Sequence, residues 1–244
     1  MAKTIAIVGA GPLVGMAAAQ RFGREGFKVA LLARNMDKLK NLVATLEADG
    51  IEAGAFEADV LDHKQLTAAL ETVSKRYGFI DVLEYSPTPP PDSMRGPLDL
   101  DVENEQLHLN MNILAPITAV RAVLPQMRVR KEGSIIITAA ASAQHPAAMT
   151  ASYGVAAGGT LNYVRLLNKA LSPEGIYAGM VSIAGLIVRQ GEENGPPPPG
   201  FPSGLPLVAA QDVADLIWDL HVRRDRVEAY AGDINALLAN SLLY

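Results

Sequence analysis

Residues 4–15 read TIAIVGAGPLVG, a short apolar and β-branched run that leads into three glycines. The run predicts a buried strand at Thr4–Gly9, and a helix is expected to follow the glycines. Gly9, Gly11 and Gly15 would then lie in the turn between strand and helix, where backbone without side chains can approach a pyrophosphate closely. The helix N-terminus would offer unpaired N–H groups and a positive dipole to the same anion. The alternative is that the glycines only allow a tight turn and close helix packing.

The same alternation of strand and helix continues along the chain. Apolar residues recur at helical intervals within residues 39–46 and 66–73, so each of these segments offers one apolar stripe to a sheet. Gln211–Val222 predicts another amphipathic helix. No Pro/Ser-rich linker divides the pattern before residue 190, so we expect one α/β domain over residues 1–244, a Rossmann-like doubly wound parallel sheet with helices on both faces. The other candidate strands are Lys28–Ala33, Ile51–Asp59, Phe79–Tyr85, Gly133–Thr138 and Tyr177–Ile183.

The composition excludes several classes of protein and site. Of 244 residues, 49% are hydrophobic and 19% are charged, which allows a sizeable core and argues against disorder. The formal net charge of −5 does not suggest the basic face that nucleic-acid binding requires, so no nucleic-acid partner is expected. The absence of cysteine excludes disulfides, thiolate zinc sites and cysteine nucleophiles, and suits a reducing cytoplasm. We expect no metal site and a cytoplasmic protein.

Two uncharged stretches imitate export or membrane signals. They are Thr4–Gln20, which follows Lys3, and Gly133–Val164, which is long enough to span a bilayer. Glycine and proline interrupt the first stretch, and polar residues interrupt the second. We therefore expect buried soluble structure in both, and no membrane partner. Two proline-rich segments, Ser86–Pro97 and Gly191–Pro206, are expected to contain no helix.

The end of the second predicted strand carries a cation. Enzymes specific for NAD usually place an acidic residue there, whereas this chain reads LLARNMDKL with Arg34 at that place. A guanidinium can bind a 2′-phosphate through two hydrogen bonds, so the sequence predicts that NADP(H) is preferred and NAD(H) is possible. The alternative is a solvated arginine near a helix start. Asp59, at the end of the third predicted strand, would face the adenine or cap the helix that follows.

The order of elements and these motifs resemble the short-chain dehydrogenase/reductase family over nearly the whole chain. The resemblance implies a nicotinamide cofactor, a small-molecule substrate, and hydride transfer to or from a carbonyl or alcohol carbon. It also implies that Asp59 and Val60 contact the adenine, and that Asn112 and Tyr153 stand at the family's catalytic positions. The proline-rich segment at residues 190–206 would be the substrate lid.

Other positions depart from the family's pattern. The glycine-rich motif becomes VGAGPLVG, so that Leu13 stands where a glycine is usual, and Leu13 and Val14 join the three glycines in the expected cofactor-binding turn. The family's active-site lysine is replaced by Ala157 and its catalytic serine by Ala140. Ser142 lies two residues after the lost serine, where its hydroxyl would assist the reaction or satisfy local backbone groups.

The segment after the sixth predicted strand resembles the family's cofactor-contacting segment. It reads AGLIVR, and the resemblance places Ile187 and Arg189 beside the cofactor. We hypothesise that Arg189 restores part of the positive charge lost with the lysine. The alternative is a solvent-facing arginine at the root of the lid.

The missing lysine affects the two reaction directions differently. An unperturbed tyrosine has a pKa of about 10, so ionising Tyr153 at pH 7 would require roughly 4 kcal/mol. Oxidation of an alcohol would be slow, whereas in reduction the tyrosine only has to donate its proton. The sequence thus predicts an NADP(H)-dependent reductase of a small carbonyl or enone, with Asn112 and Ser142 assisting Tyr153. The alternative is a catalytically impaired NADP(H)-binding protein, acting as a sensor or an assembly subunit.

Two predicted helices suggest self-association. Asp101–Lys131 and Ser152–Leu171 resemble the family's pairing helices, and the second carries several small residues near its start that permit close helix approach. A homodimer or homotetramer is therefore expected, with packing inside one chain as the alternative.

Overall fold

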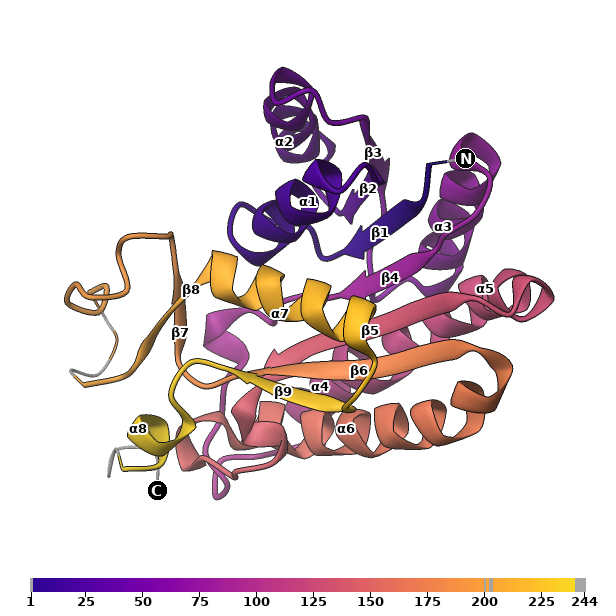
Figure 1. Cartoon of the computed structure of the whole chain (residues 1–244). Helices are drawn as coiled ribbons and strands as arrows, with labels where there is room; N and C mark the ends of the chain where they lie inside the picture. The colour runs from indigo at the N-terminus through magenta and orange to yellow at the C-terminus, as the bar shows by residue number, and fades with distance from the viewer. Residues whose placement is uncertain (1, 200, 202–203, 240–244) are drawn as a thin grey trace.

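The computed structural model describes residues 2–199, 201 and 204–239. Its main sheet contains β1 (Thr4–Val8), β2 (Lys28–Ala33), β3 (Ala53–Glu57), β4 (Val82–Tyr85), β5 (Gly133–Ala140), β6 (Ile176–Ile183) and β9 (Glu228–Ala231). All seven strands are parallel, in the order β3-β2-β1-β4-β5-β6-β9 (Figure 1). The expected Rossmann-like α/β fold is confirmed.

Helices cover both faces of the sheet (Figure 1). The α-helices among the described residues are α1 (Val14–Arg24), α2 (Met36–Ala48), α3 (His63–Tyr77), α4 (Val102–Leu109), α5 (Ala115–Arg130), α6 (Ala151–Leu171), α7 (Ala210–Arg223) and the short α8 (Ile234–Leu238), which has no buried residue. Successive strand residues point to opposite faces. In β1, Ile5 and Ile7 join the apolar core beneath α1, α2 and α7, whereas Ala6 and Val8 join the core beneath α3, α5 and α6. Burial on both faces explains why the strand sequences are apolar throughout.

The chain changes direction across the sheet between β1 and β4. It adds β2 and β3 on one side of β1, then crosses to β4 on the other side. Ligands of open α/β sheets bind outside the carboxyl ends of the strands at such a switch point. The turn after β1 and the loop after β4 both lie there, so the topology places the glycine-rich turn at the expected binding crevice.

Several predicted strand bounds were wrong. The strand predicted at Phe79–Tyr85 begins only at Val82, because Gly78 ends α3 with a φ of 97° and the chain is still turning at Phe79. The strand predicted at Ile51–Asp59 is shorter at both ends, and Asp59 already lies in a turn where its N–H bonds to the Gln65 side chain. The strands β5 and β6 are longer than predicted, by two residues and one residue.

The proline-rich segments contain more structure than expected. A single 3-10 turn, Pro91–Ser93, lies in the first segment, contrary to the expectation of no helix. The second segment lies between β7 (Leu186–Val188) and β8 (Leu207–Ala209), which form a separate two-stranded parallel sheet. Residues 200, 202 and 203 of the expected lid lie outside the described residues. The helix predicted at Gln211–Val222 is confirmed as α7.

One helical stretch among the described residues, Val102–Arg130, is long and apolar enough to cross a membrane by length and composition. It consists of α4, a π-helical turn at Asn110–Leu114, and α5. Its residues Ala119 and Val123 are fully buried in the core that α3 and α6 also form. A core helix passes the same test, and this one packs on the sheet. The uncharged stretch Gly133–Val164 forms β5 and the first part of α6.

Candidate active site

Two cavities lie at the carboxyl ends of the central strands. The first has a volume of about 420 Å³ and extends from the glycine-rich turn to α6. The second has a volume of about 290 Å³ and extends from the same turn to the ends of β2 and β3. Gly9, Gly11, Pro87 and Thr88 line both cavities, so the two volumes meet along this wall. Together they offer an elongated cleft with the turn at its middle.

The three glycines of the turn have different structural roles. Gly9 has a φ of +86°, and a Cβ there would lie 2.5 Å from the Pro87 nitrogen. A Cβ on Gly15 would lie 2.8 Å from the Ala10 Cα. For these two glycines the tight-turn interpretation is sufficient. A Cβ on Gly11 would meet nothing closer than the Gly9 carbonyl oxygen at 4.0 Å, so this glycine leaves open space where the two cavities meet.

The N-terminus of α1 opens towards the first cavity. Leu13 occupies the N-cap position, and none of the described side chains accepts a hydrogen bond from the first turn. Leu13 and Val14 both line the first cavity. The uncapped N–H groups and the helix dipole therefore favour an anion here, as the sequence predicted.

The second cavity contains the predicted nucleotide-contacting residues. Arg34, Asp59 and Val60 line it together with Gly11. The Arg34 side chain is exposed and forms no ion pair with the described residues. Asp59 Oδ1 accepts a hydrogen bond of 2.9 Å from the Leu61 N–H. The interpretation of Asp59 as a helix cap was wrong, because the Asp62 carboxylate caps α3.

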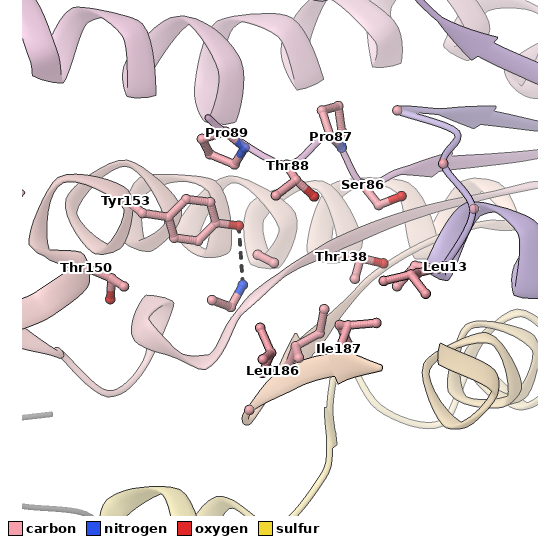
Figure 2. A pocket seen from close by; sticks show the side chains of 18 of the residues that line it. Leu13, Ser86, Pro87, Thr88, Pro89, Thr138, Thr150, Tyr153, Leu186 and Ile187 are labelled. Atoms are coloured by element: carbon pink, nitrogen blue, oxygen red, sulfur yellow. Dashed lines mark hydrogen bonds between the residues drawn. The ribbon is translucent and has the colours of Figure 1, made fainter. Parts of the chain in front are cut away.

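Tyr153 enters the first cavity from α6, across from Leu13, Ser86 and Thr138 (Figure 2). Its hydroxyl oxygen accepts a hydrogen bond of 3.3 Å from the Ala140 N–H, at the carboxyl end of β5. The side chain is 8% exposed, and burial raises the pKa of Tyr153 to about 12, against the opposing effect of the Ala140 N–H. The cavity therefore holds a neutral phenol whose proton is free to be donated.

Ala157, where the resemblance implies a lysine, is closely packed. Ala157 follows Tyr153 by one helical turn and is 1% exposed. Both residues, with Asn112 and Thr160, line a void of about 10 Å³, close to the smallest volume that holds one water molecule. The Asn112 side chain donates to the His108 backbone carbonyl oxygen, and the backbone carbonyl oxygen of Asn112 accepts from the Thr160 hydroxyl. The structure thus brings Asn112 and Tyr153 together, and the described residues that line the void include no cation.

Two other predicted residues lie elsewhere. Ser142 lines a separate cavity beside Ala151 and Gly154, and not the one that contains Tyr153. Arg189 is exposed, its N–H donates to the Glu192 carboxylate, and it lines neither cavity of the cleft. Ile187 does line the first cavity (Figure 2).

The sequence analysis missed an acidic residue beside the site. Glu84 is fully buried in β4, and its carboxylate oxygens accept hydrogen bonds from the Ser86 hydroxyl at 2.9 Å and the Thr138 hydroxyl at 3.0 Å. Burial raises the pKa of Glu84 to about 8 despite these two donors. The available signal was Glu84 itself, one of two acids with Asp81 in the predicted strand FIDVLEY, because central parallel strands are normally apolar throughout.

Comparisons with known proteins agree with this geometry. A family model described as short chain dehydrogenase matches residues 3–189. The uncharacterized oxidoreductase Lmo0432 of Listeria monocytogenes is 29% identical over 181 residues, which cover 74% of this chain and 72% of that protein. The putative ketoacyl reductase of the monensin polyketide synthase of Streptomyces virginiae is 27% identical over 175 residues, covering 72% and 67%.

A solved structure shows the same fold over nearly the full chain. Actinorhodin polyketide ketoreductase, crystallised with NADPH as a point variant, superposes with a TM-score of 0.83 at 21% identity. The match covers 96% of this chain and 97% of that one.

Proposed function

The chain belongs to the short-chain dehydrogenase family, and from this premise we propose that it is an NADP(H)-dependent reductase of a small carbonyl or enone. One observation carries the proposal. The hydroxyl of Tyr153, a neutral proton donor, opens into the same cavity as the glycine-rich turn and the uncapped start of α1. Hydride acceptance and proton donation at one carbonyl need such a pairing of cofactor site and acid.

The residues of the cleft fit a dinucleotide along its length. The open space at Gly11 and the N-terminus of α1, with Leu13 and Val14, would hold the pyrophosphate. Arg34 would bind the 2′-phosphate, which favours NADP(H) and leaves NAD(H) possible. The adenine would lie against Asp59 and Val60, and Ile187 would contact the other half of the cofactor. When bound, the cofactor would supply the hydride.

Tyr153 would donate its hydroxyl proton to the oxygen of the reduced carbonyl. The Ala140 N–H would stabilise the negative charge left on the phenol oxygen. The reverse reaction is much less favourable, because ionising a phenol of pKa about 12 at pH 7 requires roughly 7 kcal/mol, five units at 1.36 kcal/mol each. Reduction is therefore the proposed direction, with Asn112 holding the helix that faces Tyr153.

The walls of the first cavity favour an uncharged, largely apolar substrate. None of the described residues that line it carries a formal charge at neutral pH, and Pro89, Met94 and Leu186 are among them. The similarity to a ketoacyl reductase supports a carbonyl substrate. Residues 190–206 would cover the bound substrate.

Cofactor binding and isotope transfer test this proposal. We expect calorimetric titration to show tighter binding of NADPH than of NADH, and Arg34→Ala to remove the difference. Deuterium from labelled NADPH should appear on the carbonyl carbon of a reduced product in a panel of small ketones and enones. Binding of neither cofactor would overturn the proposal.

A second candidate is an NADP(H)-binding protein without turnover, acting as a sensor or an assembly subunit. Ala140 and Ala157 favour it, because both replace groups that assist the tyrosine in the family. The double variant Ala140→Ser/Ala157→Lys separates the two candidates. New turnover from an inactive parent would support the second candidate, and loss of an existing activity would support the first.

We also infer a homodimer or homotetramer, with a cytoplasmic location as the associated prediction. Apolar side chains remain exposed on and between the helices expected to pair, namely Leu114, Val155 and Leu166. Mass measurement in solution tests the oligomeric state, and a monomer at micromolar concentration would exclude it.

A further inference from the structure

Glu84 connects the middle of the sheet to the first cavity through two hydroxyl groups. It lies in β4, between Ile7 of β1 and Ile136 of β5, and is 0% exposed. Its carboxylate binds the hydroxyls of Ser86 and Thr138, and both of these residues line the cavity (Figure 2). The acid itself does not line the cavity, so any effect on a ligand passes through Ser86 and Thr138.

Among the described residues, no charged neighbour explains the presence of an acid at this position. Burial raises the pKa of Glu84, and only the two hydroxyls oppose that shift. The side chain lies on the same face of β4 as Val82, which packs in the core beneath α1 and α7. The charged or titratable residues of these two helices are exposed, paired with other residues, or at the opposite end of the strands: Arg21, Arg24, Asp212, Asp215, Asp219, His221 and Arg223. Tyr85 points to the other face of the sheet, and Tyr153 lies across the cavity.

The protonation state of Glu84 decides which groups the cavity wall presents. An ionised carboxylate only accepts, so both hydroxyl protons are used inside the wall. A neutral carboxyl must donate its own proton to one of the two hydroxyls. That hydroxyl then has its proton free to donate into the cavity. One proton on Glu84 thus adds a hydrogen-bond donor to the wall and removes a buried negative charge.

We propose that Glu84 is a positioning residue for the cofactor, and that binding of a dinucleotide is coupled to the protonation of its carboxyl. Neutral Glu84 lets Ser86 or Thr138 donate to an oxygen of the bound dinucleotide. When Glu84 is ionised, binding draws one proton from solvent, because the negative charge of the bound phosphates disfavours a negative charge on the Glu84 carboxylate. This inference rests on the proposed cofactor binding.

The coupling gives a defined pH dependence. A bound anion raises the pKa of Glu84 above its free value of about 8. The affinity for NADPH is then constant below about pH 7, where the free carboxyl is already neutral. Above pH 8 the affinity falls by up to about tenfold per pH unit, until the pH reaches the pKa of Glu84 in the complex.

Calorimetric titration with NADPH at pH 6.5 and pH 9, each in two buffers of different ionisation enthalpy, measures the protons taken up on binding. We expect proton uptake at pH 9, up to one proton per site, and almost none at pH 6.5. Glu84→Gln keeps a neutral side chain of the same size, and should take up no proton and bind with nearly equal affinity at both values. Glu105→Gln is the matched control, because burial also raises the pKa of Glu105 but this residue lines neither cavity of the cleft. It should behave as the parent protein.

Binding at pH 9 without proton uptake would overturn the inference, and so would uptake that persists in Glu84→Gln. If Glu84→Gln does not fold, Thr138→Val tests the same coupling. It removes a donor that favours the ionised carboxyl, so proton uptake should begin at a higher pH, and an unchanged onset would contradict the coupling. Absence of NADPH binding at both pH values would instead overturn the proposed function. The titration of the parent protein distinguishes this outcome from binding without proton uptake.

Discussion

At the turn between β1 and α1 the cleft offers backbone N–H groups, whereas at its α6 end it offers side-chain hydroxyls, among them that of Tyr153. Both ends differ from the pattern that the resemblance implies. Leu13 stands where the resemblance implies a glycine, yet the helix N-terminus stays uncapped and the space at Gly11 stays open. At α6, Ala157 stands where the resemblance implies a cation, and no described residue that lines the adjacent void supplies one. Recognition by backbone tolerates a changed side chain, whereas proton transfer depends on particular side chains and their pKa values.

Tyr153→Phe tests the α6 end with the largest expected effect. Removing the hydroxyl removes the proton donor, so the reduction rate should fall by roughly 10²- to 10⁴-fold while the affinity for NADPH is unchanged. Tyr163→Phe is the matched control, since Tyr163 is a partly buried tyrosine on the same helix that does not line the cleft. Steady-state rates and calorimetry give the two readouts. Full activity in Tyr153→Phe would assign proton donation to another group.

The two reaction directions should respond differently to pH. Since burial raises the pKa of Tyr153 to about 12, the ionised fraction rises with pH throughout the accessible range. The rate of alcohol oxidation at saturating cofactor should therefore rise by about a hundredfold from pH 7 to pH 9, at tenfold per unit. The rate of carbonyl reduction, which uses the neutral phenol, should stay nearly constant. An oxidation rate that levels off near pH 7 would show that a cation stabilises the phenolate.

The fold was largely predictable because each strand is an apolar run between helices with one apolar face. Strand ends were less predictable, since Phe79 is apolar but follows the left-handed turn at Gly78, and its ring lies exposed under the Arg130 guanidinium. The short strands β7, β8 and β9 were missed, because runs of three or four residues have too little periodicity to stand out.

The site was predictable where it depends on motifs along one segment, as for Gly11 and Arg34. It was not predictable where it depends on contacts between strands. Spacing placed Ser142 near the lost serine, but the chain turns after β5 and directs this residue to another cavity. Glu84 meets Thr138, a residue 54 positions later, only because β4 and β5 pair in the sheet.

Gly9→Ala tests how far the turn tolerates a side chain. The positive φ alone makes alanine unfavourable by about 1–3 kcal/mol, and the new Cβ would also overlap Pro87. Gly26→Ala is the control, because Gly26 has a similar φ of +83° but a Cβ there would meet no atom within 4 Å. Urea unfolding of both variants isolates the effect of the Pro87 contact. Equal losses of stability would show that Pro87 and the loop after β4 shift to accommodate the new Cβ.

Arg34→Ala tests the side-chain part of nucleotide recognition. We expect the affinity for NADPH to fall by about tenfold, equivalent to roughly 1.4 kcal/mol, because an exposed guanidinium still forms charge-assisted hydrogen bonds with a phosphate. The affinity for NADH, which lacks the 2′-phosphate, should not change. Arg24→Ala is the control, since Arg24 is exposed at the far end of α1. Equal losses for both cofactors would assign Arg34 to local structure.

Asp59 and Asp62 allow the finest separation of recognition from folding, because they lie three residues apart with different partners. Asp62 accepts from the N–H groups of Lys64 and Gln65 and caps α3, so Asp62→Ala should lower the free energy of unfolding by about 1 kcal/mol and leave NADPH binding unchanged. Asp59 lines the second cavity, and among the described residues its side chain accepts only from the Leu61 N–H. Asp59→Ala should weaken NADPH binding by about fivefold, the effect of one hydrogen bond, with a smaller change in stability. If the two variants show the same pattern, Asp59 shapes the turn into α3, and adenine recognition rests on Val60 and its apolar neighbours.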